Sequence, residues 1–264
     1  MNIYRYEFRK RLGSTLIWVV SLGVYTYFTF AFFQSFNDPS MLELLDSFPD
    51  AFKKAFGLDQ DLSSILGYFA FVGIYLFLAG AIFSAGLGLN AVSVEERDLT
   101  ADFLIAKPVT RNRIVTAKLL AGLTHILIFN LSMGLVSYFG MESFKGEQSY
   151  AMSTFLLIMG GLFIFQVLFF SFSFLLSVLM KRMDNPLPFS LGLSIGLFVL
   201  YSFDALIKDT PIKYLVPYDY FDLGYIIQND AFKASGLIIS LVVIAASIVA
   251  GYSLYNRRNI ATAM

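Results

Sequence analysis

Cysteine is absent from the 264-residue chain, and histidine occurs only once. Without cysteine, the chain can form no disulfide, no thiolate metal site and no cysteine nucleophile. The single histidine, His125, lies inside a long apolar run, which excludes an H-E-x-x-H zinc site and a histidine-containing catalytic triad within the chain. We therefore expect no catalytic residue, no metal site and no bound cofactor here.

The lysine of a P-loop is also missing. A P-loop requires G-x-x-x-x-G-K-[ST], because its backbone amides and its lysine embrace the phosphates of ATP. None of the nineteen glycines is followed by lysine. Any ATP hydrolysis linked to this protein must take place on another polypeptide.

Charged residues are scarce, at 14% of the chain, whereas 57% of the residues are hydrophobic and the mean hydropathy is +0.69. Soluble domains contain roughly 45–50% apolar residues, so this composition indicates an integral membrane protein. A helix needs on the order of 20 apolar residues to cross a hydrocarbon core of about 30 Å. Six runs are long enough: Thr15–Phe36, Ile65–Val92, Ile114–Phe139, Thr154–Met180, Leu187–Ile207 and Ala234–Leu254. Because backbone groups in lipid must be paired within their own segment, we predict an all-α membrane protein with six transmembrane helices in one domain, residues 1–264.

Basic residues are divided unevenly between the two sides of the membrane. With the N-terminus in the cytoplasm, 13 of the 19 Lys and Arg residues fall on that side, and most acidic residues fall on the other. The positive-inside rule then predicts that both termini are cytoplasmic. The formal net charge of zero gives no reason to expect nucleic acid as a partner.

Three segments outside the spans have amphipathic character. Residues 1–13 place apolar and basic side chains on opposite helical faces, which is typical of an interfacial elbow helix; a simple positive-inside anchor explains the same pattern. Residues 37–62 form an external amphipathic segment in which Pro49 breaks or restarts the helix. Residues 93–113 form a cytoplasmic loop.

This loop is highly charged and encloses a small apolar cluster at Phe103 and Leu104. Thr100 is positioned to cap a short helix, and Asp102 favours the positive end of its dipole. Pro108 ends the helix, because proline disfavours helical geometry in the residue before it.

Thr110 then restarts a helix that continues as the third span. The result is a short helix at the cytoplasmic surface with a membrane helix at each end. A charged juxtamembrane loop that only sets the topology is the alternative explanation.

The loop sequence VEERDLTADFLIAKPVTRNRIVTAKLL, residues 94–120, resembles the first cytoplasmic loop of ABC-2-type transporter permeases. That family has an acidic pair, a short helix, a Pro-Val/Ile-Ser/Thr-Arg turn and a lysine early in the next span. SFPDAFKKAFGL, residues 47–58, is similar to the family's external segment, and YLVPYDYFDLGYII, residues 214–227, to its segment before the last span. The resemblance covers nearly the whole chain.

In this family the loop helix is a coupling helix that inserts into a groove of a cytoplasmic ATPase. The resemblance therefore implies two ABC ATPase subunits that carry ATP and Mg, a second permease subunit in a homodimer or heterodimer, and a multi-pass location in the plasma membrane. The expected contact and coupling residues are Glu95, Glu96, Asp98, Thr100, Phe103, Leu104, Lys107, Pro108 and Arg111. Lys118 matches the basic residue of the following span.

Polar groups inside the spans are the other candidates for function. His125 could line a pathway or bind protons, but a histidine with Asn130 nearby is also typical of a hydrogen bond between helices. Gly192 and Gly196 have the G-x-x-x-G spacing of close helix packing, either within the chain or across a permease dimer. The phenylalanines of the fourth span could line an apolar route or face lipid.

These observations predict the permease subunit of an ABC transporter that exports an apolar or amphipathic substrate, such as a drug, lipid or peptide. An ion-coupled secondary transporter is one alternative, although it would lead us to expect paired charges or broken helices in the membrane. A non-transporting sensor or immunity protein is the other. The sequence leaves open the substrate, the direction of transport and the identity of the ATPase.

Overall fold

The computed structural model describes residues 3–49, 52–53, 56–97, 109–180, 183, 185–204 and 214–257. Within these ranges the chain is helical and contains no strand. The long helices are α1 (Ile3–Ala31), α4 (Ile65–Arg97), α6 (Arg111–Phe144), α7 (Met152–Leu179), α8 (Pro186–Asp204) and α11 (Ala234–Arg257). Shorter helices are η1 (Phe33–Asn37), α2 (Pro39–Asp46), α9 (Pro217–Tyr220) and α10 (Leu223–Asn229).

The six long helices coincide with the six predicted spans, and each is long and apolar enough to cross a membrane. This confirms the all-α, multi-pass fold. At about 1.5 Å per residue, the 29, 33 and 34 residues of α1, α4 and α6 extend roughly 43 to 51 Å. These three helices are therefore longer than a hydrocarbon core of about 30 Å and project beyond it.

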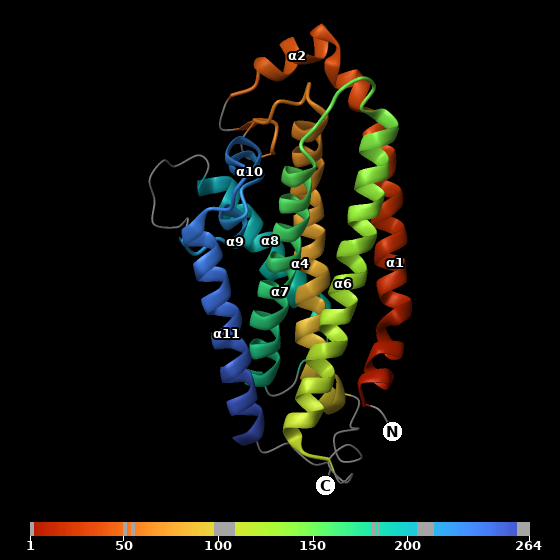
Figure 1. Ribbon diagram of the computed structural model, residues 1–264. Coiled ribbons are helices and arrows are strands. Elements are labelled where there is room, and N and C mark those ends of the chain that lie inside the picture. The colour runs from red at the N-terminus through yellow and green to blue at the C-terminus, as the bar shows by residue number, and fades with distance from the viewer. Residues whose placement is uncertain are drawn as a thin grey trace.

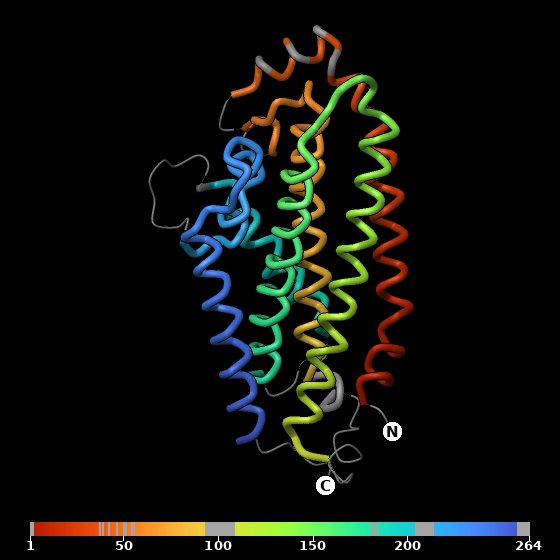
Figure 2. Tube along the Cα trace, in the orientation of Figure 1, coloured from red at the N-terminus to blue at the C-terminus, as the bar shows by residue number. Residues whose placement is uncertain are grey.

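The long helices run alternately up and down in one bundle (Figures 1 and 2). α4 and α7 are the most buried spans and pack most extensively against each other. α1 packs along α6 on one side of this pair, while α8 contacts α4 and α11 contacts α7. α8 and α11 are the least buried of the six spans.

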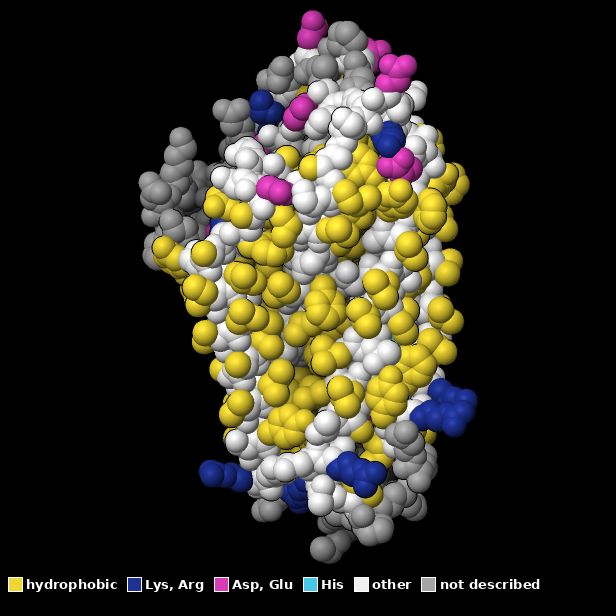
Figure 3. All heavy atoms as spheres, in the orientation of Figure 1, with side chains coloured by type: hydrophobic (Ala, Val, Ile, Leu, Met, Phe, Trp, Pro, Cys, Tyr) yellow, Lys and Arg dark blue, Asp and Glu magenta, His cyan; other side chains and the backbone are white. Residues whose placement is uncertain are grey.

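The two ends of the bundle differ in charge. Figure 3 shows the Asp and Glu side chains of one face gathered at its upper end, together with a few Lys or Arg, whereas the charged side chains visible at the lower end are Lys and Arg. The start of α1, the end of α4, the start of α6 and the end of α11 all lie at the lower end (Figure 1). We call the lower end the basic end and the upper end the acidic end; that the basic end is cytoplasmic remains a prediction of the positive-inside rule.

The first helix differs from the prediction of a separate elbow. α1 continues without interruption from Ile3 to Ala31, so residues 3–13 and the first span form one helix. Its first turns pack on α6: the hydroxyls of Tyr4 and Thr124 lie 3.0 Å apart, and the Phe8 ring stacks on the His125 ring with centroids 4.9 Å apart. These side contacts hold the segment along α6.

The external segment covers the acidic end, where α2 lies above the bundle (Figure 1). Asp38 caps α2, because its carboxylate accepts a hydrogen bond of 2.9 Å from the backbone N–H of Ser40. Further along the chain, α9 and α10 pack back against the spans. They bury Tyr218, whose ring lies 4.9 Å from that of Phe165 in α7.

Glycine allows the central pair of helices to approach closely. A Cβ atom on Gly88 of α4 would lie 2.4 Å from the carbonyl oxygen of Phe170 and 2.8 Å from the backbone nitrogen of Phe174, both in α7. Only glycine fits such a contact, so this small residue lets the second and fourth spans pack closely within the chain. In contrast, Gly192 and Gly196 of α8 are exposed, and a Cβ on either would meet nothing within 4 Å.

The Gly88 contact predicts a position-specific loss of stability. Gly88→Ala forces the backbones of α4 and α7 apart, and we expect a cost of about 1–3 kcal/mol, typical of overpacking. Gly86→Ala is the matched control, because its Cβ would meet only the Ser190 hydroxyl at 3.9 Å. Thermal unfolding of the two purified variants in detergent measures the difference, and equal midpoints would contradict the contact.

Candidate functional site

The predicted coupling loop falls largely outside the described residues. Asp98, Thr100, Phe103, Leu104, Lys107 and Pro108 all lie there. Glu95 and Glu96 belong to the last turn of α4, but their side chains are also outside the description. The structure instead shows how α4 and α6, the helices before and after the loop, are joined to the rest of the bundle.

The helix after the loop begins where the sequence predicts. Thr110 is the N-cap of α6, and its hydroxyl oxygen accepts a hydrogen bond of 3.4 Å from the backbone N–H of Arg113. The bond satisfies one of the amide groups that a helix start leaves unpaired. The boundary between loop and span is therefore confirmed at Thr110.

Arg111, the first residue of α6, joins this helix to the end of α11. Its Nη1 donates to the carbonyl oxygens of Tyr255 and Asn256, at 3.2 and 3.1 Å. The last carbonyls of a helix lack partners within it and carry the negative end of its dipole, so a guanidinium is well suited to them. The side chains of Asn112 and Asn256 add a hydrogen bond of 2.7 Å between the same two helices.

Lys118, about two turns further along α6 than Arg111, joins this helix to α1. Its Nζ lies 3.0 Å from Oε1 of Glu7, and both side chains are buried, with 2% and 8% of their surface exposed. A charge buried in so apolar a bundle is tolerable when an opposite charge neutralises it. Sequence reasoning assigned no role to Glu7, although it is the only acidic residue before Asp38.

Arg11 joins α1 to α4, about two turns before α4 ends. Its guanidinium donates to the carbonyl oxygen of Asn90 at 2.9 Å. The Asn90 side chain in turn donates to the carbonyl oxygen of Gly86 at 2.8 Å, one turn earlier. We call the three connections made by Arg11, Lys118 and Arg111 the basic-end contacts.

His125 is fully buried between α6 and α1. Its Nδ1 shares a hydrogen bond of 2.9 Å with the hydroxyl of Thr15, and its ring stacks on Phe8. Of the two roles considered for His125, these contacts correspond to a hydrogen bond between helices. The partner is Thr15, and Asn130 bonds elsewhere.

Asn130 bonds across to α7. Its amide nitrogen donates to Oε1 of Gln166 at 3.3 Å, and Gln166 is fully buried. A Cβ on Gly80 of α4 would approach Nε2 of Gln166 to 3.0 Å, so the pair lies where α4, α6 and α7 meet. Sequence reasoning did not select Gln166, although it is the only amide side chain of the fourth span.

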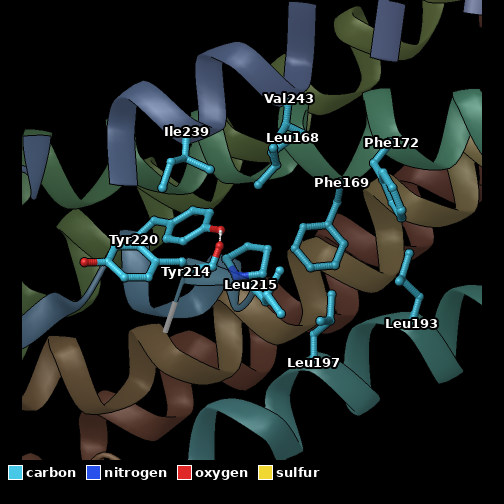
Figure 4. A pocket seen from close by; sticks show the side chains of 11 residues that line it. Leu168, Phe169, Phe172, Leu193, Leu197, Tyr214, Leu215, Tyr220, Ile239 and Val243 are labelled. Atoms are coloured by element: carbon cyan, nitrogen blue, oxygen red, sulfur yellow. Dashed lines mark hydrogen bonds between the residues drawn. The ribbon is translucent and has the colours of Figure 1, made fainter. Parts of the chain in front are cut away.

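An apolar cavity of about 360 Å³ opens between α7, α8 and α11 (Figure 4). Phe169 and Phe172 of α7 line it, together with Leu193 and Leu197 of α8. Phe165, Phe170 and Phe174 are instead buried in the core, so the phenylalanines of the fourth span serve mainly for packing between helices. The residues from 214 to 220 close the cavity toward the acidic end.

A smaller, polar cavity of about 230 Å³ adjoins the apolar one and shares Tyr214, Tyr220 and Ile239 with it. The Nζ of Lys233 lies here, 3.0 Å from Asp219 and 3.1 Å from Asp222. Burial alone would lower the pKa of Lys233, but the two carboxylates outweigh it and raise this pKa above its usual value. Lys233 therefore stays protonated at neutral pH.

Metal-binding side chains are not grouped in the part of the chain that the structure describes. No three His, Asp or Glu residues lie close enough there to hold a metal ion. The polar groups above form contacts between helices and a charged mouth to the cavity.

Comparison with known families finds that residues 1–260 match the family described as ABC-2 family transporter protein. The match extends over almost the full length and confirms the resemblance drawn from the loop and its neighbouring segments. No match is found among curated proteins.

Because the ion pair is buried, we predict that removing one of its two charges destabilises the protein more than removing both. Lys118→Met leaves the Glu7 carboxylate buried without its cation, and removing one partner of such a pair costs about 3–5 kcal/mol. The double variant Glu7→Leu, Lys118→Met removes both charges and should recover much of the loss. Arg9→Ala, an exposed charge on α1, should have little effect.

Thermal unfolding midpoints in detergent of the unchanged protein, Glu7→Leu, Lys118→Met and the double variant form a double-mutant cycle. A double variant that is as unstable as the two single changes added together would show that the two charges do not depend on each other.

Proposed function

Since the chain belongs to the ABC-2 family of transporter proteins, we propose that it is the transmembrane permease subunit of an ATP-driven exporter. The ATP-hydrolysing subunits are separate polypeptides, because this chain has no P-loop. Two such subunits would act with two permease subunits, identical or different. The permease supplies the pathway for the substrate, and the conformational change of the ATPase subunits on ATP binding is transmitted to it.

The basic-end contacts carry this proposal. The loop of 98–108 joins α4 to α6, and the contacts extend from these two helices to α1 and α11. Arg111 ties the start of α6 to the end of α11, and the Lys118–Glu7 pair ties α6 to α1. A displacement of the loop would therefore act on four of the six spans together.

Rigid connections of this kind let ATP binding favour one packing of the spans over another. Coupling is then a free energy shared between the ATPase and the pathway, and it requires two arrangements whose contacts differ. Contacts between charged side chains and carbonyl oxygens are suitable elements, since they can be exchanged without opening the apolar core. The central α4–α7 pair, with its close glycine contact, would move as a unit.

At the loop itself, Phe103 and Leu104 would form an apolar knob that is buried in a groove of the ATPase. Burial of a small apolar centre supplies most of the affinity at such an interface. The surrounding charges, Glu95, Glu96 and Asp98 before it and Arg111 after it, would orient the two surfaces.

The substrate is an apolar or amphipathic molecule in this proposal. The apolar cavity supports that class, since its wall offers phenylalanine and leucine side chains and its volume lies within the roughly 300–1,000 Å³ typical of ligand pockets. The buried contacts of His125 and Asn130 resemble helix packing rather than the charged relay of an ion-coupled transporter.

The knob predicts loss of ATPase capture. Phe103→Ala combined with Leu104→Ala removes the apolar centre of the contact, and we expect at least a tenfold loss of copurified ATPase activity from native membranes. Leu135→Ala, on the exposed face of α6, is the control and should copurify normally. Normal capture by an inserted double variant would disprove the role of the knob.

The contacts of Arg111 predict that the coupling of ATP hydrolysis to transport can be lost while the ATPase still binds. Arg111→Ala breaks the bonds to Tyr255 and Asn256 but leaves the apolar knob intact. It also removes one of the charges around the knob, which contributes little affinity beside the apolar centre, so the ATPase should still copurify while substrate transport per ATP hydrolysed falls severalfold. Arg113→Ala, an exposed residue of the same helix turn, is the matched control. Transport and ATP hydrolysis in proteoliposomes measure the ratio, and an unchanged ratio in Arg111→Ala would contradict transmission through α11.

A further inference from the structure

The apolar cavity has the form of a slot that runs along the helices. Leu193 and Leu197 of α8 are one turn apart, as are Ile239 and Val243 of α11, so both helices present successive turns to the same space. Figure 4 shows their side chains directed toward the gap, into which Phe169 and Phe172 of α7 also point. An elongated hydrocarbon chain fits such a wall better than a globular polar solute does.

One end of the slot meets polar groups. Tyr220 separates the apolar cavity from the polar one, and its hydroxyl donates a hydrogen bond to the carbonyl oxygen of Tyr214, as the dashed line in Figure 4 shows. That bond fixes the ring in place and satisfies its only polar atom. A ligand that fills both spaces must therefore be apolar along its length and polar at the end near Tyr214 and Asp219.

The charge at this mouth is negative. The ammonium group of Lys233 contacts two carboxylates: that of Asp219, which also lines the polar cavity, and that of Asp222, which lies behind Lys233 and lines a separate small cavity. This group of three described side chains carries one net negative charge. The surroundings have the same sign: between the spans on the acidic side, the sequence holds twelve Asp and Glu residues and six lysines. Such a field attracts a cation and disfavours an anion.

Aromatic rings at the mouth add to this preference. The ring of Tyr214 is about half exposed and lines both cavities. Aromatic faces attract alkylammonium groups, whose charge is spread over apolar carbons and easily desolvated. A carboxylate beside a tyrosine ring is thus a suitable receptor for an ammonium head.

We propose that this cavity binds a cationic amphiphile, with the hydrocarbon chain between α7, α8 and α11 and an ammonium head beside Asp219. Binding rests on the cavity itself; its part in transport rests on the proposed function. Bound there, the molecule places its ammonium head toward the acidic end of the bundle, and its hydrocarbon chain runs from there along α7 and α8.

Photo-crosslinking of the full chain in nanodiscs tests the site. The probe is a dodecyl trimethylammonium with a diazirine on its chain, and the comparison probe carries a sulfate head on the same chain. We expect the ammonium probe to label α7 and α8 at least fivefold more than the sulfate probe does. Asp219→Asn should reduce that preference severalfold, because Asp222 then neutralises Lys233 without an excess charge.

Filling the cavity supplies the second comparison. Leu197→Trp and Val243→Trp, introduced from different helices, should each reduce labelling by the ammonium probe at least fivefold. Leu200→Trp is the matched control on an exposed part of α8 that does not line the cavity, and it should leave labelling unchanged. The two cavity variants keep the test decisive if one of them fails to fold.

Equal labelling by the two probes, or equal labelling of the Leu197→Trp and Leu200→Trp proteins, would overturn the site. Because the binding assay contains no ATPase, such a result leaves the proposed exporter function standing. Conversely, normal ATPase capture by the knob variant would contradict the exporter proposal without changing the crosslinking result.

Discussion

The buried pair of Glu7 and Lys118 is the interaction on which the basic end of the bundle depends. In hydrocarbon the backbone of each helix is satisfied internally, so helices are oriented by packing and by the few polar side chains that reach across. Here a complete positive charge on α6 is neutralised by a negative charge on α1 at 3.0 Å. The pair fixes the rotation and height of α1 along α6, and the contacts of Thr15 with His125 and of Tyr4 with Thr124 follow in the same interface.

From this pair the polar contacts extend in both directions around the loop. Arg11 reaches the last third of α4 and Arg111 reaches the end of α11, in each case by bonding to backbone carbonyl oxygens. Toward the acidic end the contacts include aromatic packing and hydrogen bonds such as that from the Tyr68 hydroxyl in α4 to the carbonyl oxygen of Thr29 in α1, and the apolar cavity lies to one side, between α7, α8 and α11. The chain thus has a strongly cross-linked end near the loop and a more open region near the proposed ligand site, which is the division of tasks expected of a permease.

Much of the fold could be predicted from the sequence, because length and hydropathy report directly on a bilayer. The six spans and the helix start at Thr110 are examples, since each depends on local sequence. The partner of Lys118 could not be predicted, because Glu7 is 111 positions away and resembles an ordinary juxtamembrane charge. Gly192 and Gly196 illustrate the same limit: their spacing indicates close packing, but spacing alone does not say which helix lies opposite, and within the described chain none does. The cavity was equally hidden, since the faces of α7, α8 and α11 that line it are set by how the three helices pack and not by any local pattern.

Absence of cysteine makes the central claim directly measurable. Gly13 of α1 and Leu254 of α11 are both exposed, and a spin label at each would report the separation of the two helices that the basic-end contacts join to α6. Gly13→Cys combined with Leu254→Cys, assembled with its ATPase in nanodiscs, can be followed by pulsed electron paramagnetic resonance with and without ATP. Coupling through the basic-end contacts predicts an ATP-dependent change in the distance distribution that is lost when Arg111→Ala is added. A distribution that ATP leaves unchanged, in an assembly that still transports, would contradict it.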